Sequence, residues 1–176
     1  MTEFDYGLDF DKIDFRERPD LYRVGRGEQG VLSVEPYKSE ILPHWRFRTH
    51  EVALKSAAKI YRLYERYKAA NDFVGMDMAR KFLQMGWTRG MRYANHRSGR
   101  KYVGPVPAGR EGRSGAWGRE VAPREPDGEK LKSALVFKER LEAVRADSDY
   151  VAARRAHRER YESPAGRAAK ATPKRA

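Results

Sequence analysis

The segment KFLQMGWTRGMRYANHRSGRKYVG, which spans residues 81–104, combines cationic side chains with aromatic rings and contains no acidic residue. Arginine and lysine neutralise phosphates and release their counterions, and exposed rings can stack on bases. We therefore predict that this part of the chain forms a nucleic-acid-binding surface. The side chains expected to form it are Arg80, Lys81, Arg89, Arg92, Asn95, Arg97, Arg100 and Lys101.

The roles of the rings and of the amide within this segment are open from sequence alone. Asn95 could read the edge of a base, because its amide both donates and accepts hydrogen bonds. For Phe82, Trp87 and Tyr93, packing in the core is the more frequent role, and stacking on a base is the alternative. For the arginines we favour phosphate contact, and the alternative is an internal ion-pair network with acids such as Asp72 or Asp77.

The positive charge of the chain is concentrated in blocks. The net charge is +12, and residues 46–120 hold 17 basic against 6 acidic residues. Residues 151–176 add 8 basic against 2 acidic residues, whereas residues 1–45 are net acidic. Blocks of this size attract polyanions. We therefore expect nucleic acid as the partner, with DNA ahead of RNA, bound without catalysis.

A glycine-rich stretch, RVGRGEQG, is a candidate phosphate-binding loop. Backbone N–H groups around Gly25, Arg26 and Gly27 could face a phosphate. The stretch has neither the spacing nor the Lys-Ser/Thr of a Walker loop, and it does not open a helix. A turn that needs positive φ angles is the favoured alternative.

Asp20, Glu35 and Lys38 are the candidate residues for a catalytic site. Two carboxylates and a lysine beside one hairpin resemble the arrangement of a metal-dependent nuclease, in which the carboxylates hold Mg²⁺. The E-x-x-K spacing departs from that pattern, because residues three apart on a regular strand point to opposite faces. Surface charges beside a proline turn are the favoured interpretation, so an enzyme acting on nucleic acid or a nucleotide remains the second hypothesis.

Other chemistry is excluded by residues that the chain lacks or scatters. Cysteine is absent, which excludes disulfides and a thiolate zinc site. The four histidines show no ligand spacing, so we expect no bound metal and no cofactor. No apolar run approaches the length of a membrane span, and the acidic N-terminus is no signal peptide. We therefore expect a cytoplasmic protein, for which association with the nucleoid would be compatible.

The elements that position these residues are typical of an α+β fold. Leu21–Val24 and Val31–Val34 are rich in β-forming residues and flank GRGEQG, which predicts a β-hairpin or small antiparallel sheet. We expect it to pack on an α-helical body that forms one domain over residues 1–162, followed by a disordered basic tail over 163–176. Gly86 either ends the second helix or lies within it on the same face as Gly90. Helices are expected to begin at Thr49, Asn71-Asp72, Glu129 and Asp147-Ser148-Asp149.

Most of the chain resembles a known family. The segments that carry the resemblance are YRVGRGEQGVLSVEPYKSEILPHWRFRT, NDFVGMDMARKFLQMG and TRGMRYANHRSGRKY. They are similar to a family of small, mostly bacterial and phage proteins that is described as a domain of unknown function. The resemblance implies no activity, cofactor or catalytic residue. A factor associated with the ribosome or with a partner protein is therefore a third hypothesis that would use the same basic residues.

Overall fold

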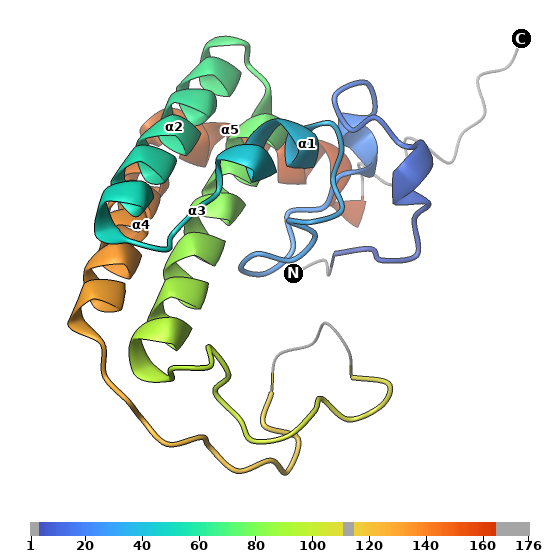
Figure 1. The fold of residues 1–176 in the computed structure, drawn as a ribbon. Helices are drawn as coiled ribbons and strands as arrows, with labels where there is room; N and C mark the ends of the chain where they lie inside the picture. Colours follow the sequence, from blue (N-terminus) through green and yellow to red (C-terminus); the bar gives the residue numbers. More distant parts are fainter. Residues whose placement is uncertain (1–3, 111–114, 165–176) are drawn as a thin grey trace, which may run out of the picture.

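The structure describes residues 4–110 and 115–164. Within these ranges the fold is built from helices. In this computed structural model, α2, α3 and α4 lie side by side, and α5 crosses behind them (Figure 1). Short 3-10 helices precede them at Phe10–Lys12, Pro19–Leu21 and Leu42–His44. The α-helices are α1 (Tyr37–Ile41), α2 (His50–Ala69), α3 (Phe73–Asn95), α4 (Gly128–Ala146) and α5 (Ser148–Tyr161).

The predicted helix starts are confirmed by side-chain caps. The Thr49 side chain accepts a hydrogen bond from the backbone N–H of Val52 (3.2 Å), and Asp72 accepts one from Gly75 (3.0 Å). Asp147 accepts from the N–H of Asp149 (2.9 Å) at the start of α5. Each cap satisfies a donor that the first helical turn would otherwise leave unpaired.

Helix α3 is the centre of the fold, and it continues through Gly86 to Asn95. It runs antiparallel to α4, because Gly86 lies against Phe137 and Gly90 lies against Ala134. A Cβ atom at Gly90 would come within 2.8 Å of the Cβ of Ala134. The sequence alternative in which the helix continues through both glycines is therefore confirmed. The backbone of Ala134 approaches closely at Gly90, whereas at Gly86 the close neighbour is the ring of Phe137.

The predicted β-hairpin does not form, so the α+β class is wrong for this chain. Residues 21–34 make successive turns, with the N–H of Gln29 donating to the carbonyl of Arg26 and that of Ser33 to Gly30. Gly25, Gly27 and Gly30 all have positive φ angles, which reverse the chain too often for a strand. The only pairing within the described residues is an isolated bridge between Tyr102 and Val121.

The apolar residues that suggested strands are buried in turns instead. Val24 and Val34 are fully buried and Val31 is 6% exposed. They belong to the same core as the apolar residues of α3 and α5. The alternation of apolar and polar residues therefore arises because one side of an irregular segment is buried. This gives the same two-residue period as a strand.

Two further expectations concern the membrane and the tail. None of the helices in the described ranges combines the length and the apolar character needed to cross a bilayer. Residues 165–176 of the predicted tail lie outside the described residues.

Replacing Gly90 with alanine should destabilise the protein, because the new methyl group would meet Ala134 across the α3–α4 contact. We expect a loss of about 1–3 kcal/mol in the free energy of unfolding, measured by urea denaturation. Gly128→Ala is the control, since a Cβ there meets no atom within 4 Å. Equal stability of the Gly90→Ala protein and the wild type would contradict the close packing of α3 on α4.

Candidate functional site

The far end of α3 and the loop that follows it carry exposed cations. Arg92, Arg97 and Arg100 are exposed, and their side chains form no hydrogen bond or ion pair with any described residue. Arg89, also exposed, lies over the ring of Trp45, 5.7 Å from its centroid. Lys101 lies 5.5 Å from the ring centroid of Tyr102. Five of the predicted cations are therefore free to meet an anion.

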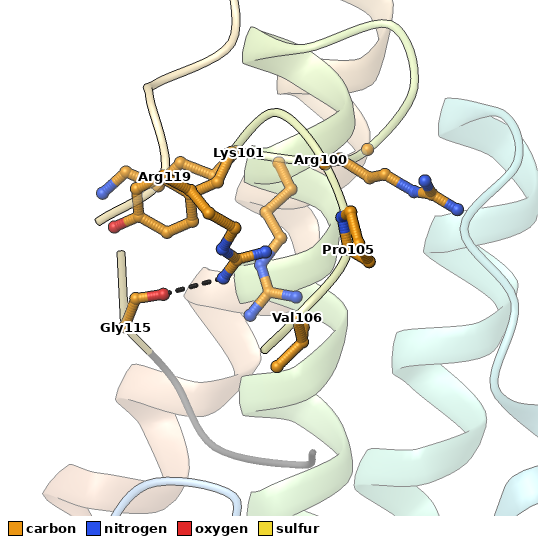
Figure 2. Close-up of a pocket in the computed structure, with 10 residues that line it drawn as sticks. Arg100, Lys101, Pro105, Val106, Gly115 and Arg119 are labelled. Carbon is orange, nitrogen blue, oxygen red and sulfur yellow. Dashed lines mark hydrogen bonds between the residues drawn. The ribbon is translucent and has the colours of Figure 1, made fainter. Parts of the chain in front are cut away.

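Three of these cations, Arg92, Arg100 and Lys101, line a hollow of about 620 Å³, which we call the basic pocket. No acidic residue lies among its described lining residues. Figure 2 shows Arg119 with its hydrogen bond to Gly115, whereas Arg100 extends to the opposite side. The pocket therefore concentrates positive charge at one end of the molecule. Its cationic lining residues are Arg92, Arg100, Lys101 and Arg119.

Arg119 is a lining residue that the sequence interpretation missed. Its guanidinium donates to the carbonyls of Gly115 (2.9 Å) and Ala116 (3.1 Å) and lies 5.0 Å from the Tyr102 ring centroid. The N–H of Val103 donates to the carbonyl of Glu120, and the N–H of Ala122 donates to that of Lys101. These two hydrogen bonds hold the residues around Arg119 beside Lys101. The only sequence signal is that Arg119 is one of three arginines in a glycine-rich stretch, which does not predict this long-range pairing.

Asn95 holds the loop in place and is not free to read a base. Its Nδ2 donates to the carbonyl of Met91 (2.8 Å), and its Oδ1 accepts from Arg124 (2.7 Å). Its backbone carbonyl accepts from Glu125 (2.8 Å). The neighbouring His96 is buried, and its Nδ1 lies 3.0 Å from the carbonyl of Pro123. Together these contacts fasten the returning end of the loop to α3.

The rings near this surface are mostly covered by other residues. Trp45 and Phe47 have ring centroids 4.9 Å apart, and Phe47 and Tyr93 have centroids 5.8 Å apart. The other neighbour of Tyr93 is Gly99, where a Cβ atom would come within 2.6 Å of the ring. Tyr93 is nevertheless 38% exposed, so part of its ring packs on its own chain and part faces solvent beside the basic pocket.

A second hollow, of about 410 Å³, adjoins Tyr93 and contains Arg97. Unlike the basic pocket, it is lined by acidic as well as basic side chains, with Glu125 and Asp127 facing Arg97 and Lys130. The mixed charge makes it a poorer site for a phosphate. Arg97 therefore stands apart from the four cations of the basic pocket.

Arg80 and Lys81 are buried, which removes them from the predicted surface. Arg80 is 6% exposed and Lys81 is fully buried. The Nε of Arg80 donates to Asp77 (2.7 Å) and its Nη1 to the carbonyl of Gly27 (2.9 Å). The Nζ of Lys81 donates to the carbonyl of Gln29 (2.7 Å). A buried cation needs such partners, and here Asp77 lies three and four residues before them on one helix.

Asp77 is the acceptor at the centre of this interior cluster. Its carboxylate accepts hydrogen bonds from Tyr22 (2.5 Å) and Tyr150 (2.6 Å) as well as from Arg80. Burial raises the pKa of Asp77, but the charges of Arg80 and Lys81 outweigh burial and hold the pKa well below its usual range. The carboxylate is therefore ionised and joins the N-terminal segment, α3 and α5.

Lys81 lies in an apolar and aromatic environment. Its ammonium group is 5.0 Å from the ring centroid of Phe4 and 4.8 Å from that of Tyr22. Burial lowers the pKa of Lys81 to about 7, with the charge of Asp77 opposing this shift and the charge of Arg80 adding to it.

The glycine-rich loop does not form a phosphate cradle. Gly25 and Gly27 have positive φ angles, as the favoured turn interpretation predicts. The N–H of Arg26 is taken by the side chain of Gln29 (2.7 Å), and the carbonyls of Gly27 and Gln29 accept from the buried cations Arg80 and Lys81. The loop therefore directs carbonyl acceptors toward buried cations, whereas a phosphate site would need N–H donors directed toward the ligand.

The candidate catalytic residues occupy separate ion pairs. Asp20 is bound by the Nε and Nη2 of Arg18 (2.9 and 3.1 Å), and Glu35 pairs with Lys38 (2.6 Å). The hairpin that was expected to bring Asp20 opposite Glu35 is not present. Among the described residues, no group of three or more carboxylates or histidines is arranged to hold a metal ion.

Comparison with known proteins places the chain in a family. Residues 5–160 match a family model described as "Domain of unknown function (DUF4385)". The chain belongs to this family. Neither the curated proteins nor the solved structures contain a match. The matched range includes both the basic pocket and the interior cluster around Asp77, so the family resemblance that the sequence suggested is confirmed at this level.

The Lys81 environment of this DUF4385 member predicts a pH dependence. The folded pKa of about 7 lies below the ordinary value of 10.5, so between these values the unfolded chain binds a proton that the folded chain lacks. The free energy of unfolding should therefore rise with pH across this window, by up to about 1.4 kcal/mol per pH unit. Lys81→Met should abolish that rise between about pH 7 and pH 9 in urea denaturation.

The exposed Lys101→Met variant is the control for this measurement, and it should keep the pH dependence of the wild type. If the Lys81→Met and wild-type proteins showed the same slope, Lys81 would keep its proton in the folded state as the charged partner of Asp77.

Proposed function

We propose that this protein binds nucleic acid without catalysis, with DNA ahead of RNA, through the basic pocket and the exposed arginines beside it. The observation that carries the proposal is the pocket itself, in which four cations meet without an acidic neighbour among the described lining residues. A cytoplasmic location belongs to the same proposal.

The electrostatics of the pocket suit a polyanion. Exposed cations without carboxylate partners keep their attraction for phosphates, and each phosphate contact releases counterions. If all four cations contacted phosphates, the logarithm of the binding constant would fall with the logarithm of salt concentration with a slope of about −3 to −4. Arg89, outside the pocket on α3, would add a further contact.

The set of proposed binding residues changes once burial is taken into account. Arg80 and Lys81 leave the set because their N–H groups are bound within the core. Asn95 is also removed, because its side chain positions the loop that follows α3. Arg119 is added, because it lines the basic pocket. The proposed surface therefore comprises Arg89, Arg92, Arg100, Lys101 and Arg119, with Arg97 at its margin.

Among the described residues, no contact favours either of the two other hypotheses over this one. A metal-dependent nuclease would use Asp20, Glu35 and Lys38, whose side chains are held in two separate ion pairs. A factor associated with a ribosome or a partner protein would use the same exposed cations. A pull-down of the native protein, with and without nuclease treatment, separates these classes.

Replacing Arg92 and Arg100 together with alanine should weaken binding to an oligonucleotide of about 30 nucleotides by roughly tenfold or more. The reason is the loss of two pocket cations, which should also reduce the salt slope by about two. Fluorescence anisotropy across a series of salt concentrations measures both quantities.

The matched control is Arg62→Ala with Arg66→Ala, which removes two exposed arginines from α2 and changes the net charge equally. It should retain most of the affinity. Equal losses in both double variants would show that only overall charge matters, and binding that ignores salt would remove the electrostatic basis of the proposal.

A further inference from the structure

Two arginines of α5 lie on the side of the helix that faces the core. Tyr150 and His157 are buried, and Arg154 and Arg158 lie close to them around the helix because residues three and four apart share a face. The Nε of Arg154, and the Nε and Nη2 of Arg158, are shielded from solvent and make no hydrogen bond within the described residues. Buried N–H donors in proteins normally have a hydrogen-bond acceptor. These three donors therefore indicate that a bound group supplies the acceptor.

Further cations lie next to Arg154. The Nη2 of Arg145, at the end of α4, donates to Oε1 of Gln84 (3.2 Å), which also accepts from Arg80 (2.9 Å). Burial lowers the pKa of Arg145, and the positive charges of Arg80 and Arg154 lower it further. The charge of Glu142 opposes this shift without cancelling it, so burial and the cationic neighbours outweigh the nearby carboxylate.

Two of the three carboxylates of this region, Asp77 and Glu142, have partners outside the three arginines, and the third, Glu162, is the ion-pair partner of Arg158. Asp77 accepts from two tyrosines and Arg80, as described above. Glu162 accepts from the N–H of Val24 (2.8 Å) and lies 3.8 Å from the Nε of Arg158. Glu142 pairs with Lys138 (3.6 Å). No carboxylate in the described ranges forms a hydrogen bond with Arg145 or Arg154, so the local charge is positive.

We propose that Arg154 and Arg158 on α5, together with Arg145 at the end of α4, form a binding site for a phosphate group. A tetrahedral phosphate offers several acceptor oxygens, and guanidinium groups bind such anions through paired hydrogen bonds. The side chain of Arg158 is 30% exposed, and Arg154 is also partly exposed, so both side chains reach the surface, with the shielded N–H groups lying beneath it.

This site is separate from the basic pocket and does not depend on the proposed function. Helix α5 packs near the beginning of α3, where Tyr150 meets Asp77, whereas the loop that follows α3 lies at the opposite end of that helix (Figure 1). Residues of this loop line the basic pocket. The phosphate comes from one of two sources, a small phosphorylated molecule or the backbone of a nucleic acid, and the chemistry of recognition is the same.

Thermal unfolding with inorganic phosphate as the probe tests the site. Compared with sodium chloride at equal ionic strength and pH, phosphate should raise the melting temperature of the wild type in a saturable way. In the Arg154→Gln/Arg158→Gln variant, the affinity for phosphate should fall roughly tenfold or more. The Arg92→Ala/Arg100→Ala variant should respond like the wild type. No phosphate-specific rise, or an equal rise in the α5 variant, would overturn the proposal.

A measurement on the wild type keeps the test valid if the α5 variant fails to fold. In arginine side-chain NMR, phosphate should shift the Nε–Hε signals of Arg154 and Arg158 along a saturating curve. Shifts confined to other arginines, or no shift, would overturn the proposal. A short oligonucleotide that displaces phosphate from these signals identifies the nucleic-acid backbone as the source, and one that leaves phosphate bound identifies a small phosphorylated ligand.

Discussion

The buried carboxylate of Asp77 is the interaction on which the rest of the structure depends. A carboxylate enters a protein interior only when donors replace its water. Here the donors come from three parts of the chain: Tyr22 in the N-terminal segment, Arg80 on α3 and Tyr150 on α5. Satisfying this one group therefore fixes how the first and last segments lie against the central helix.

This requirement also explains how the N-terminal segment folds without a sheet. A segment of turns has backbone carbonyls that no strand partner satisfies. Two of them, at Gly27 and Gln29, accept instead from Arg80 and Lys81, which Asp77 neutralises in part. The positive-φ glycines between the predicted strands reverse the chain here, and these carbonyls face α3. The buried cations and the carbonyls of the irregular backbone thus satisfy each other's hydrogen bonds.

The sequence predicted what depends on neighbours along the chain and missed what depends on distant contacts. Thr49, Asp72 and Asp147 act within one helical turn, so their capping roles could be predicted. The hairpin could not be excluded, because burial of Val24 and Val34 in turns gives the same pattern as a strand. Arg119 reaches the basic pocket only through pairing with a segment almost twenty residues earlier, which no local pattern encodes.

The spacing between acids and cations explains why the cations early in α3 are buried and those at its end are exposed. Asp77 precedes Arg80 and Lys81 by three and four residues, the spacing at which side chains on a helix meet, so these cations can enter the core. From Arg89 to Lys101 no acid stands at such a spacing, and an unpaired cation is expensive to bury. Those side chains must therefore stay at the surface, where their charge remains available to an anionic partner. The same reasoning separates Arg154 from Arg80: both lie on core-facing helix sides, but only Arg80 has a carboxylate of its own.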